Sequence, residues 1–215
     1  MNQKQIPTEV LKYELRKMQI KLSEESRSTF LTFVKKVWPE FIAGSHHKII
    51  AQKFEDISRG KIKRLIVNMP PRHTKSEFAS HLFPAWMLGQ KPKLKIIQTT
   101  HTAELSYNFG RKVRNLFDQQ EFKDVYPTVS LSQDSKAAGR FTTHAGGEYF
   151  AAGVGGAITG RGADLLIIDD PHSEQDALSQ TAMDNAYEWY TSGPRQRLQP
   201  GGAIVVVMTR WSTKD

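Results

Sequence analysis

The chain has 215 residues, with 30 Lys and Arg against 22 Asp and Glu, a formal net charge of +8 and no cysteine. Without cysteine there is no disulfide framework, no thiolate nucleophile and no cysteine zinc site. No apolar run approaches the roughly 20 residues of a membrane span, and the polar N-terminus carries no apolar signal-peptide core. The length suits one large domain, and the basic charge favours an anionic partner such as nucleic acid.

Helical patterns occupy the N-terminal part of the chain. Residues 8–36 carry apolar side chains at helical spacing in two stretches, and we interpret their scattered basic residues as a solvated face. A third helix is expected at 45–57, with Ser45 as its capping residue. His46 and His47 are adjacent and point to different parts of this helix surface, so packing near a nucleotide base is favoured over a metal site.

Residues 65–78 combine the signals of a strand, a tight loop and a helix start. The apolar run at 65–67 predicts a buried strand, and the Pro-Pro pair that follows ends it. Lys75 and Ser76 then stand directly before a helical pattern. This arrangement is typical of a phosphate-binding loop. There, backbone N–H groups hold phosphate oxygens, the lysine reaches the β- and γ-phosphates and the hydroxyl ligates Mg²⁺.

The match to the general pattern G-x-x-x-x-G-K-[ST] is incomplete, because Met69 and Thr74 occupy the two glycine positions. Taken alone, the stretch is equally compatible with an ordinary strand, turn and helix that carries a surface lysine. The rest of the chain has to decide between these two interpretations.

Helix and strand signals alternate through the middle of the chain. The expected elements are a helix at 78–88, a strand at 94–100, a helix at 102–117, a loop-rich stretch at 118–135 and a hairpin at 140–152. Pro84 is expected to kink or interrupt the first of these helices. The glycine-rich residues 153–162 form either a flexible connector or a backbone-rich loop beside a ligand, from which Arg161 projects.

A second nucleotide motif is indicated at residues 164–171, Asp-Leu-Leu-Ile-Ile-Asp-Asp-Pro. Its four apolar residues predict a buried strand whose C-terminal end presents a carboxylate where Mg²⁺ would sit. The alternative is a buried strand that ends in an ordinary Asp-Pro turn. The upstream Lys75 and Ser76 favour the nucleotide interpretation. Beyond this motif we expect a helix at 176–192, a turn at 199–202 and a strand at 203–208.

Three stretches together resemble the ATPase domain of the large terminase subunit, the DNA-packaging motor of tailed bacteriophages. They are residues 70–77 (Pro-Pro-Arg-His-Thr-Lys-Ser-Glu), 159–171 and 208–211 (Met-Thr-Arg-Trp). The resemblance covers roughly residues 38–215. It implies a P-loop α/β fold, in which helices flank a mainly parallel central sheet and the nucleotide lies at the C-terminal strand ends.

The resemblance also implies how the chain is divided. An N-terminal helical extension is expected at residues 1–45 and an ATPase core at 46–215. The large subunits of this family also carry a C-terminal nuclease domain with clustered carboxylates. Nothing in this sequence corresponds to that domain, so no nuclease activity is expected of this chain.

ATP and Mg²⁺ are the substrate and the metal that the resemblance implies. Lys75 would bind the β- and γ-phosphates, and Arg72 would sense the γ-phosphate. Ser76 and Asp169 would hold Mg²⁺. The whole nucleotide-binding loop would consist of Pro71, Arg72, His73, Thr74, Lys75, Ser76 and Glu77.

Hydrolysis requires further groups, which the resemblance also suggests. Asp170 stands where many relatives have the glutamate that orients the attacking water, with Glu174 as a fallback base. Arg161 lies where an arginine finger is expected, and residues 209–211 resemble the motif that couples hydrolysis to movement. The chain departs from the family at two positions. Thr74 replaces a glycine, which affects the tightness of the loop, and Asp170 is one methylene shorter than glutamate.

The implied partners are double-stranded DNA, a portal protein, a small terminase subunit and further copies of this chain in a ring, with a monomer expected in isolation. The implied location is the host-cell cytoplasm, transiently docked on the viral procapsid, and no membrane is involved. Two other functions remain open: another P-loop nucleic-acid motor such as a helicase, or a catalytically inactive nucleic-acid-binding module. ATP turnover separates the inactive module from either motor, and duplex unwinding identifies a helicase.

Overall fold

The computed structural model describes residues 8–212, apart from the side chain of Lys136, and these residues form a seven-stranded sheet. Its strands are β1 (Arg64–Asn68), β2 (Lys95–Thr100), β3 (Leu131–Ala137), β4 (Arg140–Thr143), β5 (Glu148–Gly153), β6 (Ala163–Asp169) and β7 (Leu198–Met208). Their order is β1-β7-β6-β2-β5-β4-β3. The strands from β1 to β5 in this order are parallel, and β4 and β3 are antiparallel additions. The predicted α/β fold with a mainly parallel sheet is confirmed.

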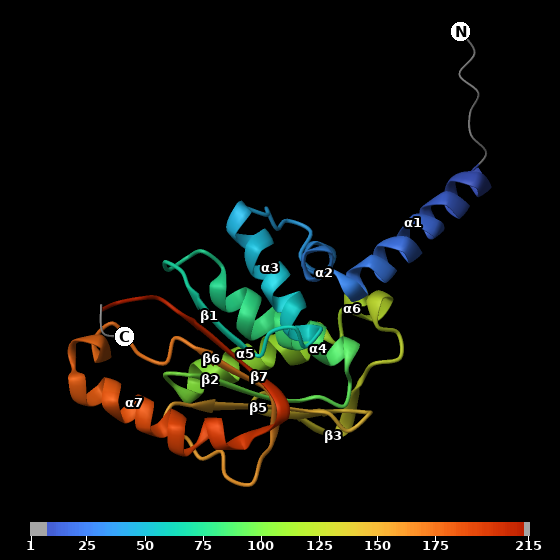
Figure 1. The fold of residues 1–215 in the computed structure, drawn as a ribbon. Coiled ribbons are helices and arrows are strands. Elements are labelled where there is room, and N and C mark those ends of the chain that lie inside the picture. Colours follow the sequence, from blue (N-terminus) through green and yellow to red (C-terminus); the bar gives the residue numbers. More distant parts are fainter. Residues whose placement is uncertain (1–7, 213–215) are drawn as a thin grey trace.

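Helices cover both faces of the sheet. They are α1 (Thr8–Ser28), α2 (Phe30–Val37), α3 (Ser45–Ser58), α4 (Phe83–Gln90), α5 (Ala103–Leu116), α6 (Gln120–Val125) and α7 (Gln180–Ser192). Figure 1 shows α3 and α4 on one side of the sheet and α7 on the other, while α1 projects from the body of the molecule. Each face of the sheet therefore has its own hydrophobic cluster, and the larger cluster lies on the side of α2 to α6.

The helices α2, α3 and α4 share this larger core. Phe30 of α2 packs against Phe54 of α3 at 5.5 Å and against Trp86 of α4 at 5.3 Å, measured between ring centroids. All three side chains are buried, and burial of an aromatic side chain of this size stabilises the fold by roughly 2–3 kcal/mol. Residues 30–37 are therefore integrated in the main core. The division of the chain at residue 45 stays a prediction.

The parallel strands bring their carboxyl ends to one edge of the sheet. In the register of the pairs, Asn68 lies beside Met208, and Asp169 lies between Thr100 and Val207. The segments that follow β1, β6 and β7 therefore meet at this edge. These are the three segments in which the sequence carries its nucleotide motifs, and ligands of open α/β sheets bind outside the carboxyl ends of the strands.

Two segments differ from the sequence-based expectation. The stretch 118–135, expected to be loop-rich, contains α6 and the start of β3. Helix α6 is too short for its period to be recognised, although it buries Phe122 and Val125 in the core. The turn expected at 199–202 is part of β7. Pro200 is tolerated there because β1 pairs with β7 only from Ile204 onward.

The helix predicted at 78–88 consists of two parts. Glu77–Leu82 forms a π-helical segment, η1, directly after the Lys-Ser pair, and α4 begins at Phe83. Pro84 thus lies in the first turn of α4, directly after the change from the π-helical to the α-helical segment, and the helix continues through it. π-Helical turns are frequent at functional sites, and this one lies beside the predicted phosphate loop.

The helix predicted at 176–192 is also divided. A short 3₁₀ segment, η2 (Asp176–Leu178), precedes α7, and Ser179 caps α7 by accepting a hydrogen bond from the Ala182 N–H group. A second 3₁₀ segment, η3 (Pro194–Arg197), leads from α7 into β7. Among residues 8–212 we find no helix with the length and apolar character that crossing a membrane requires.

Candidate nucleotide-binding site

The loop between β1 and η1 has an unusual backbone. Arg72 and Thr74 have positive φ angles of 64° and 61°, while His73 between them does not. Such alternation turns backbone N–H groups towards one side and forms a concavity that suits an anion. A left-handed residue other than glycine costs about 1–2 kcal/mol, and a β-branched residue is an outlier there. The loop is therefore strained into a shape that suits a phosphate group, although the expected glycine is missing.

Lys75 is paired with the carboxylate that follows β6. The Lys75 Nζ atom lies 2.6 Å from Oδ2 of Asp170, and only 9% of the lysine side chain is exposed. The other oxygen of Asp170 accepts a hydrogen bond from the backbone N–H group of Thr209 at 2.7 Å. Asp170 itself has a positive φ of 43°. The predicted phosphate-binding lysine and the predicted water-orienting carboxylate thus form an ion pair.

Ser76 is paired with the last residue of β6. Its hydroxyl donates to Oδ1 of Asp169 at 2.9 Å, and the hydroxyl of Ser80 donates to Oδ2 at 2.6 Å. Burial raises the pKa of Asp169 to about 6, although the hydrogen bond from Ser80 opposes this shift. A hydroxyl and a carboxylate that converge in this way are hard oxygen donors. They suit Mg²⁺, which takes one or two protein ligands and completes its shell with water and phosphate oxygens.

Comparison with solved structures gives a match to the large terminase of bacteriophage HK97. The TM-score is 0.59 with 12% sequence identity, and the match covers 86% of this chain and 38% of that terminase. The chain has a terminase-like fold. No family model and no curated protein sequence matches it. The fold that the sequence motifs predict is therefore confirmed by structure, and the chain spans 38% of the length of the terminase that it matches.

Residues 209–211 lie beside the phosphate loop in this terminase-like fold. The N–H group of Met69 donates to the carbonyl of Met208 at 3.1 Å, which ties the start of the loop to the end of β7. A cavity of about 380 Å³ between the two segments is lined by Asn68, Met69, Pro70, Pro71, Thr209, Arg210 and Trp211. Together with the bond from Thr209 to Asp170, this contact links the predicted coupling motif to both predicted nucleotide motifs.

Ser80 is a site residue that the sequence reasoning missed. It is fully buried and donates the shorter of the two hydroxyl hydrogen bonds to Asp169. The signal that could have found it is its spacing from Ser76, because residues four apart lie on the same side of a helix. Ser80 orients the Asp169 carboxylate. Its hydroxyl donates to Oδ2, whereas the hydroxyl of Ser76 donates to Oδ1.

Two predicted acidic residues do not pair with Lys75, whose partner is Asp170. Burial would raise the pKa of Glu77, but hydrogen bonds with His81 and Lys112 outweigh burial and lower this pKa to about 2. Glu77 thus faces α5 rather than the loop, although its backbone remains part of the predicted cradle. Glu174 is exposed, and among residues 8–212 its carboxylate is not one of the groups in contact with Lys75. Its role as a fallback base stays a prediction.

Arg161 lies at the other edge of the sheet. It forms an ion pair with Glu148 at the start of β5, and its guanidinium lies 3.8 Å from the ring centroid of Phe150. Glu148 is in register with Lys95, whereas Asp169 is in register with Thr100, so the two edges are roughly 17 Å apart. Asp164, three residues after Arg161 in the sequence, accepts a hydrogen bond from the Lys95 N–H group instead. A single chain does not bring Arg161 to Lys75.

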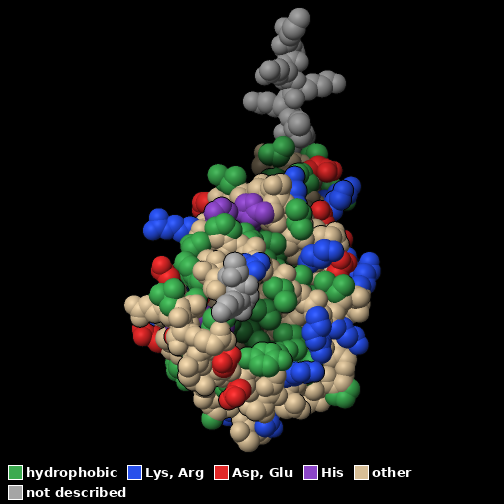
Figure 2. Space-filling view, turned by 60° about the vertical axis from the view of Figure 1, so that its left-hand side comes forward, with side chains coloured by type: hydrophobic (Ala, Val, Ile, Leu, Met, Phe, Trp, Pro, Cys, Tyr) green, Lys and Arg blue, Asp and Glu red, His purple; other side chains and the backbone are tan. Residues whose placement is uncertain are grey.

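Three histidines gather at the predicted phosphate loop. The rings of His46 and His47 are 3.8 Å apart, and the ring of His73 lies 5.8 Å from that of His46. Figure 2 shows histidine side chains grouped on this side of the surface. The pair that the sequence placed near a nucleotide is therefore close to the phosphate loop, and His47 contacts it directly, at Oγ1 of Thr74.

Proposed function

We propose that this chain hydrolyses ATP and uses the reaction to move double-stranded DNA into a viral capsid, as the motor domain of a large terminase subunit. The observation that carries the proposal is the double pairing of Lys75 with Asp170 and of Ser76 with Asp169. These pairs join a strained, anion-shaped loop to the end of a buried strand. In P-loop ATPases a loop lysine contacts the phosphates, and a loop hydroxyl and a strand-end aspartate hold Mg²⁺, which supports the same roles for Lys75, Ser76 and Asp169 here.

The pairing of Lys75 with Asp170 suggests the order of events. The Lys75 ammonium and the Asp170 carboxylate lie 2.6 Å apart. A γ-phosphate offers Lys75 a stronger anionic partner, and the released carboxylate of Asp170 then orients the attacking water. Arg72, exposed and left-handed in the same loop, would contact the γ-phosphate. Mg²⁺ held by Ser76 and Asp169 would neutralise charge on the β- and γ-phosphates.

The same arrangement offers a route from hydrolysis to movement. Asp170 accepts the N–H group of Thr209, so a shift of this carboxylate alters the segment after β7. That segment lines the cavity with the start of the phosphate loop. Residues 209–211 would therefore report the state of the nucleotide to the rest of the motor.

ATP turnover with and without double-stranded DNA tests the proposal. We expect Mg²⁺-dependent release of phosphate that DNA stimulates, and no separation of the strands of a duplex. Unwinding of a duplex would favour a helicase. The absence of nucleotide binding and turnover from a folded chain would favour an inactive nucleic-acid-binding module.

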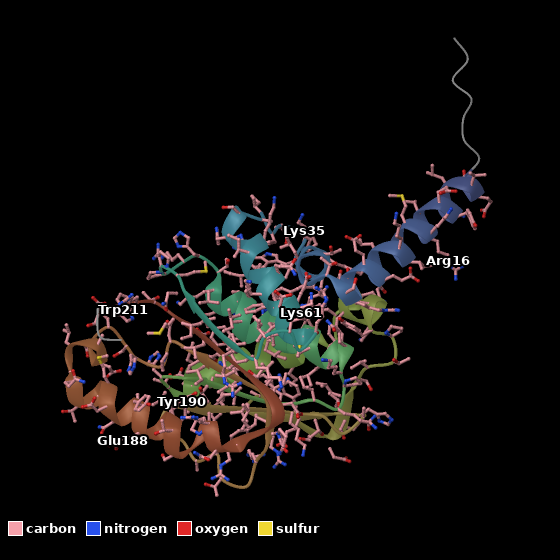
Figure 3. All side chains as sticks on the ribbon, viewed as in Figure 1. Arg16, Lys35, Lys61, Glu188, Tyr190 and Trp211 are labelled. Atoms are coloured by element: carbon pink, nitrogen blue, oxygen red, sulfur yellow. The ribbon has the colours of Figure 1, made fainter. Side chains whose placement is uncertain are left out.

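Two basic loops provide a surface for DNA at the amino ends of the parallel strands. Residues 59–64 and 91–95 lead into β1 and β2, which begin at Arg64 and Lys95, and contain no acidic residue. Their basic residues are Arg59, Lys61, Lys63, Arg64, Lys91, Lys93 and Lys95. Lys91 donates to the carbonyl of Ser58 at 2.6 Å, at the end of α3 directly before residue 59, and so holds the second loop near the first. Figure 3 shows Lys61 well away from Trp211, which marks the nucleotide edge. This surface would contact phosphates without reading bases.

Neutralising this surface should weaken DNA binding more than neutralising an equal charge elsewhere. We expect Lys61→Gln, Lys63→Gln and Lys93→Gln together to lower affinity for a random duplex by on the order of tenfold at low salt. They should also reduce the slope of log affinity against log salt by about 3. The matched control replaces Lys12, Lys17 and Lys21 on the exposed part of α1. Fluorescence anisotropy of a labelled duplex measures the affinity and its salt dependence. Equal losses of DNA affinity in the two triple variants would show that this surface is not the DNA-binding site.

Arg161 remains the proposed arginine finger, and it would act on a neighbouring copy. We expect Arg161→Ala to bind ATP normally but to lose the rise of specific activity with protein concentration that a finger in trans produces. It should also lower stability by about 1 kcal/mol, because the contacts with Glu148 and Phe150 disappear. Arg140→Ala is the control, since Arg140 contacts the same Glu148 carboxylate at 2.9 Å. If Arg161→Ala and the parent had equal activity at every concentration, the finger assignment would be lost.

The remaining parts of the proposal follow from the same resemblance. The motor would form a ring of copies of this chain and would work with a portal protein and a small terminase subunit. It would act in the host-cell cytoplasm while docked on the procapsid. Co-sedimentation of the chain with portal-bearing procapsids, compared with procapsids that lack the portal, measures this docking directly.

A further inference from the structure

A continuous chain of hydrogen bonds runs from the start of α3 into the phosphate loop. The N–H group of Gly44 donates to Nδ1 of His47 at 2.9 Å. The Nε2 atom of His47 lies 2.5 Å from Oγ1 of Thr74, and the Thr74 hydroxyl donates to the carbonyl of His73 at 2.6 Å. Nδ1 accepts a hydrogen bond, and the Thr74 hydroxyl already donates its own hydrogen to the His73 carbonyl. A neutral imidazole with its proton on Nε2, which donates to Oγ1, therefore satisfies every atom of this chain.

The surroundings of His47 fix its ring in this position. The side chain is buried, with 6% exposed, and its ring lies 4.8 Å from that of Phe41 and 5.0 Å from that of Phe78. Burial lowers the pKa of His47, and the neighbouring His46 and His73 lower it further. The imidazole is thus held by packing, and its neutral form is the form that the hydrogen bonds require.

Thr74 is the residue that needs such support. It has a φ of 61° at the position where the general phosphate-loop pattern has glycine, and a β-branched side chain disfavours this conformation. Its carbonyl also accepts the N–H group of Phe78 at 3.0 Å, at the start of η1. A change in Thr74 would therefore alter both the loop that precedes Lys75 and the helix that follows it.

We infer that His47 is a positioning residue of the phosphate loop. Its hydrogen bond holds Thr74 in the left-handed conformation that glycine adopts without help, and this keeps the backbone N–H groups and Lys75 directed at the phosphates. The expected effect on nucleotide binding rests on the proposed ATPase function. The support that His47 gives to Thr74 does not depend on that function.

Four chains form the test: the parent, His47→Ala, Thr74→Gly and the double variant. In the parent background we expect His47→Ala to raise KM and the Kd for Mg·ATP about fivefold with little change in kcat, because a cradle acts on ground state and transition state alike. In the Thr74→Gly background, the same change should alter Kd by less than about twofold. Equal weakening in both backgrounds would overturn the inference, since His47 would then act on some other part of the nucleotide.

Variants of the Thr74 side chain test the same hydrogen bond while His47 itself is unchanged. Thr74→Ser keeps the hydroxyl and should bind Mg·ATP like the parent. Thr74→Val keeps the branch but has no hydroxyl, and should match His47→Ala. Ile49→Ala is the control on the same helix, because this side chain is 64% exposed, and it should change Kd by less than about twofold. If Thr74→Val bound Mg·ATP as tightly as Thr74→Ser, the inference would be contradicted even if His47→Ala failed to fold.

Thermal unfolding without nucleotide separates this inference from the proposed function. His47→Ala should lower Tm in the parent background by about 2–4 °C more than in the Thr74→Gly background. If the parent bound no nucleotide, the ATPase proposal would fail while this Tm difference still decided whether His47 supports Thr74. If nucleotide bound but the two Tm losses were equal, the inference alone would fail.

Discussion

Replacing Lys75 with alanine is expected to lower ATP turnover more than about 10²-fold and to leave the chain folded. The lysine carries one of the positive charges of the loop, beside that of Arg72, and removal of a charge aimed at a transferring phosphoryl group has an effect of this size. The same change deprives the Asp170 carboxylate of its partner at 2.6 Å. The variant should therefore lose both the phosphate contact and the control over the water-orienting group. Steady-state phosphate release measures turnover, and far-UV circular dichroism measures folding.

An exposed lysine outside the loop provides the control. Lys53 is exposed on α3, and Lys53→Ala should retain the turnover of the parent. Near-full turnover of Lys75→Ala would mean that the loop after β1 does not bind the phosphates that are cleaved. In that case the alternative of an ordinary strand, turn and helix with a surface lysine would be correct.

The two carboxylates that follow each other at the end of β6 are expected to have different roles. Asp169→Asn should weaken Mg²⁺-dependent nucleotide binding, because its oxygens face the hydroxyls of Ser76 and Ser80. Asp170→Asn should bind nucleotide almost normally and lower turnover about 10²-fold, because the amide is a poor acceptor for the proton of the attacking water. Titration of each variant with Mg·ATP, followed by single-turnover hydrolysis, separates binding from chemistry.

Asp164 offers a matched control on the same strand. It lies near the opposite end of β6, where its carboxylate accepts the Lys95 N–H group, and Asp164→Asn should preserve both binding and turnover. Equal loss of nucleotide binding in Asp169→Asn and Asp170→Asn would contradict the division of roles. If Asp170→Asn retained turnover and Glu174→Gln lost it, the water-orienting role would move to Glu174.

The elements that the sequence predicted well are those with a local signature. The strand before Lys75 and the strand before Asp169 are apolar runs bounded by proline or acidic residues, and both are strands in the structure. The alternation of strands with helices predicted a parallel sheet, in which the carboxyl ends of the strands must meet at one edge. That topological rule was the reason to expect Ser76 and Asp169 close together. The structure has them in hydrogen-bond contact.

Contacts between distant segments were beyond such rules. The bonds of Ser80 to Asp169 and of Thr209 to Asp170 join segments that are 89 and 39 residues apart in the chain. Arg161 shows the reverse case. Its glycine-rich setting next to the β6 strand suggested a site residue, whereas register places it at the amino end of the sheet with Glu148.

By itself, the sequence determined the class of fold and the identity of the residues at the ends of β1, β6 and β7. Period, punctuation and residue chemistry are properties of short segments and are read without knowing their neighbours. Only the tertiary structure showed what contacts Thr74 at the position of the expected glycine. The contacting imidazole belongs to His47, which is 27 residues upstream in the chain. The pairing of Lys75 with Asp170 was likewise decided there, since a charge finds its partner through space and not along the chain.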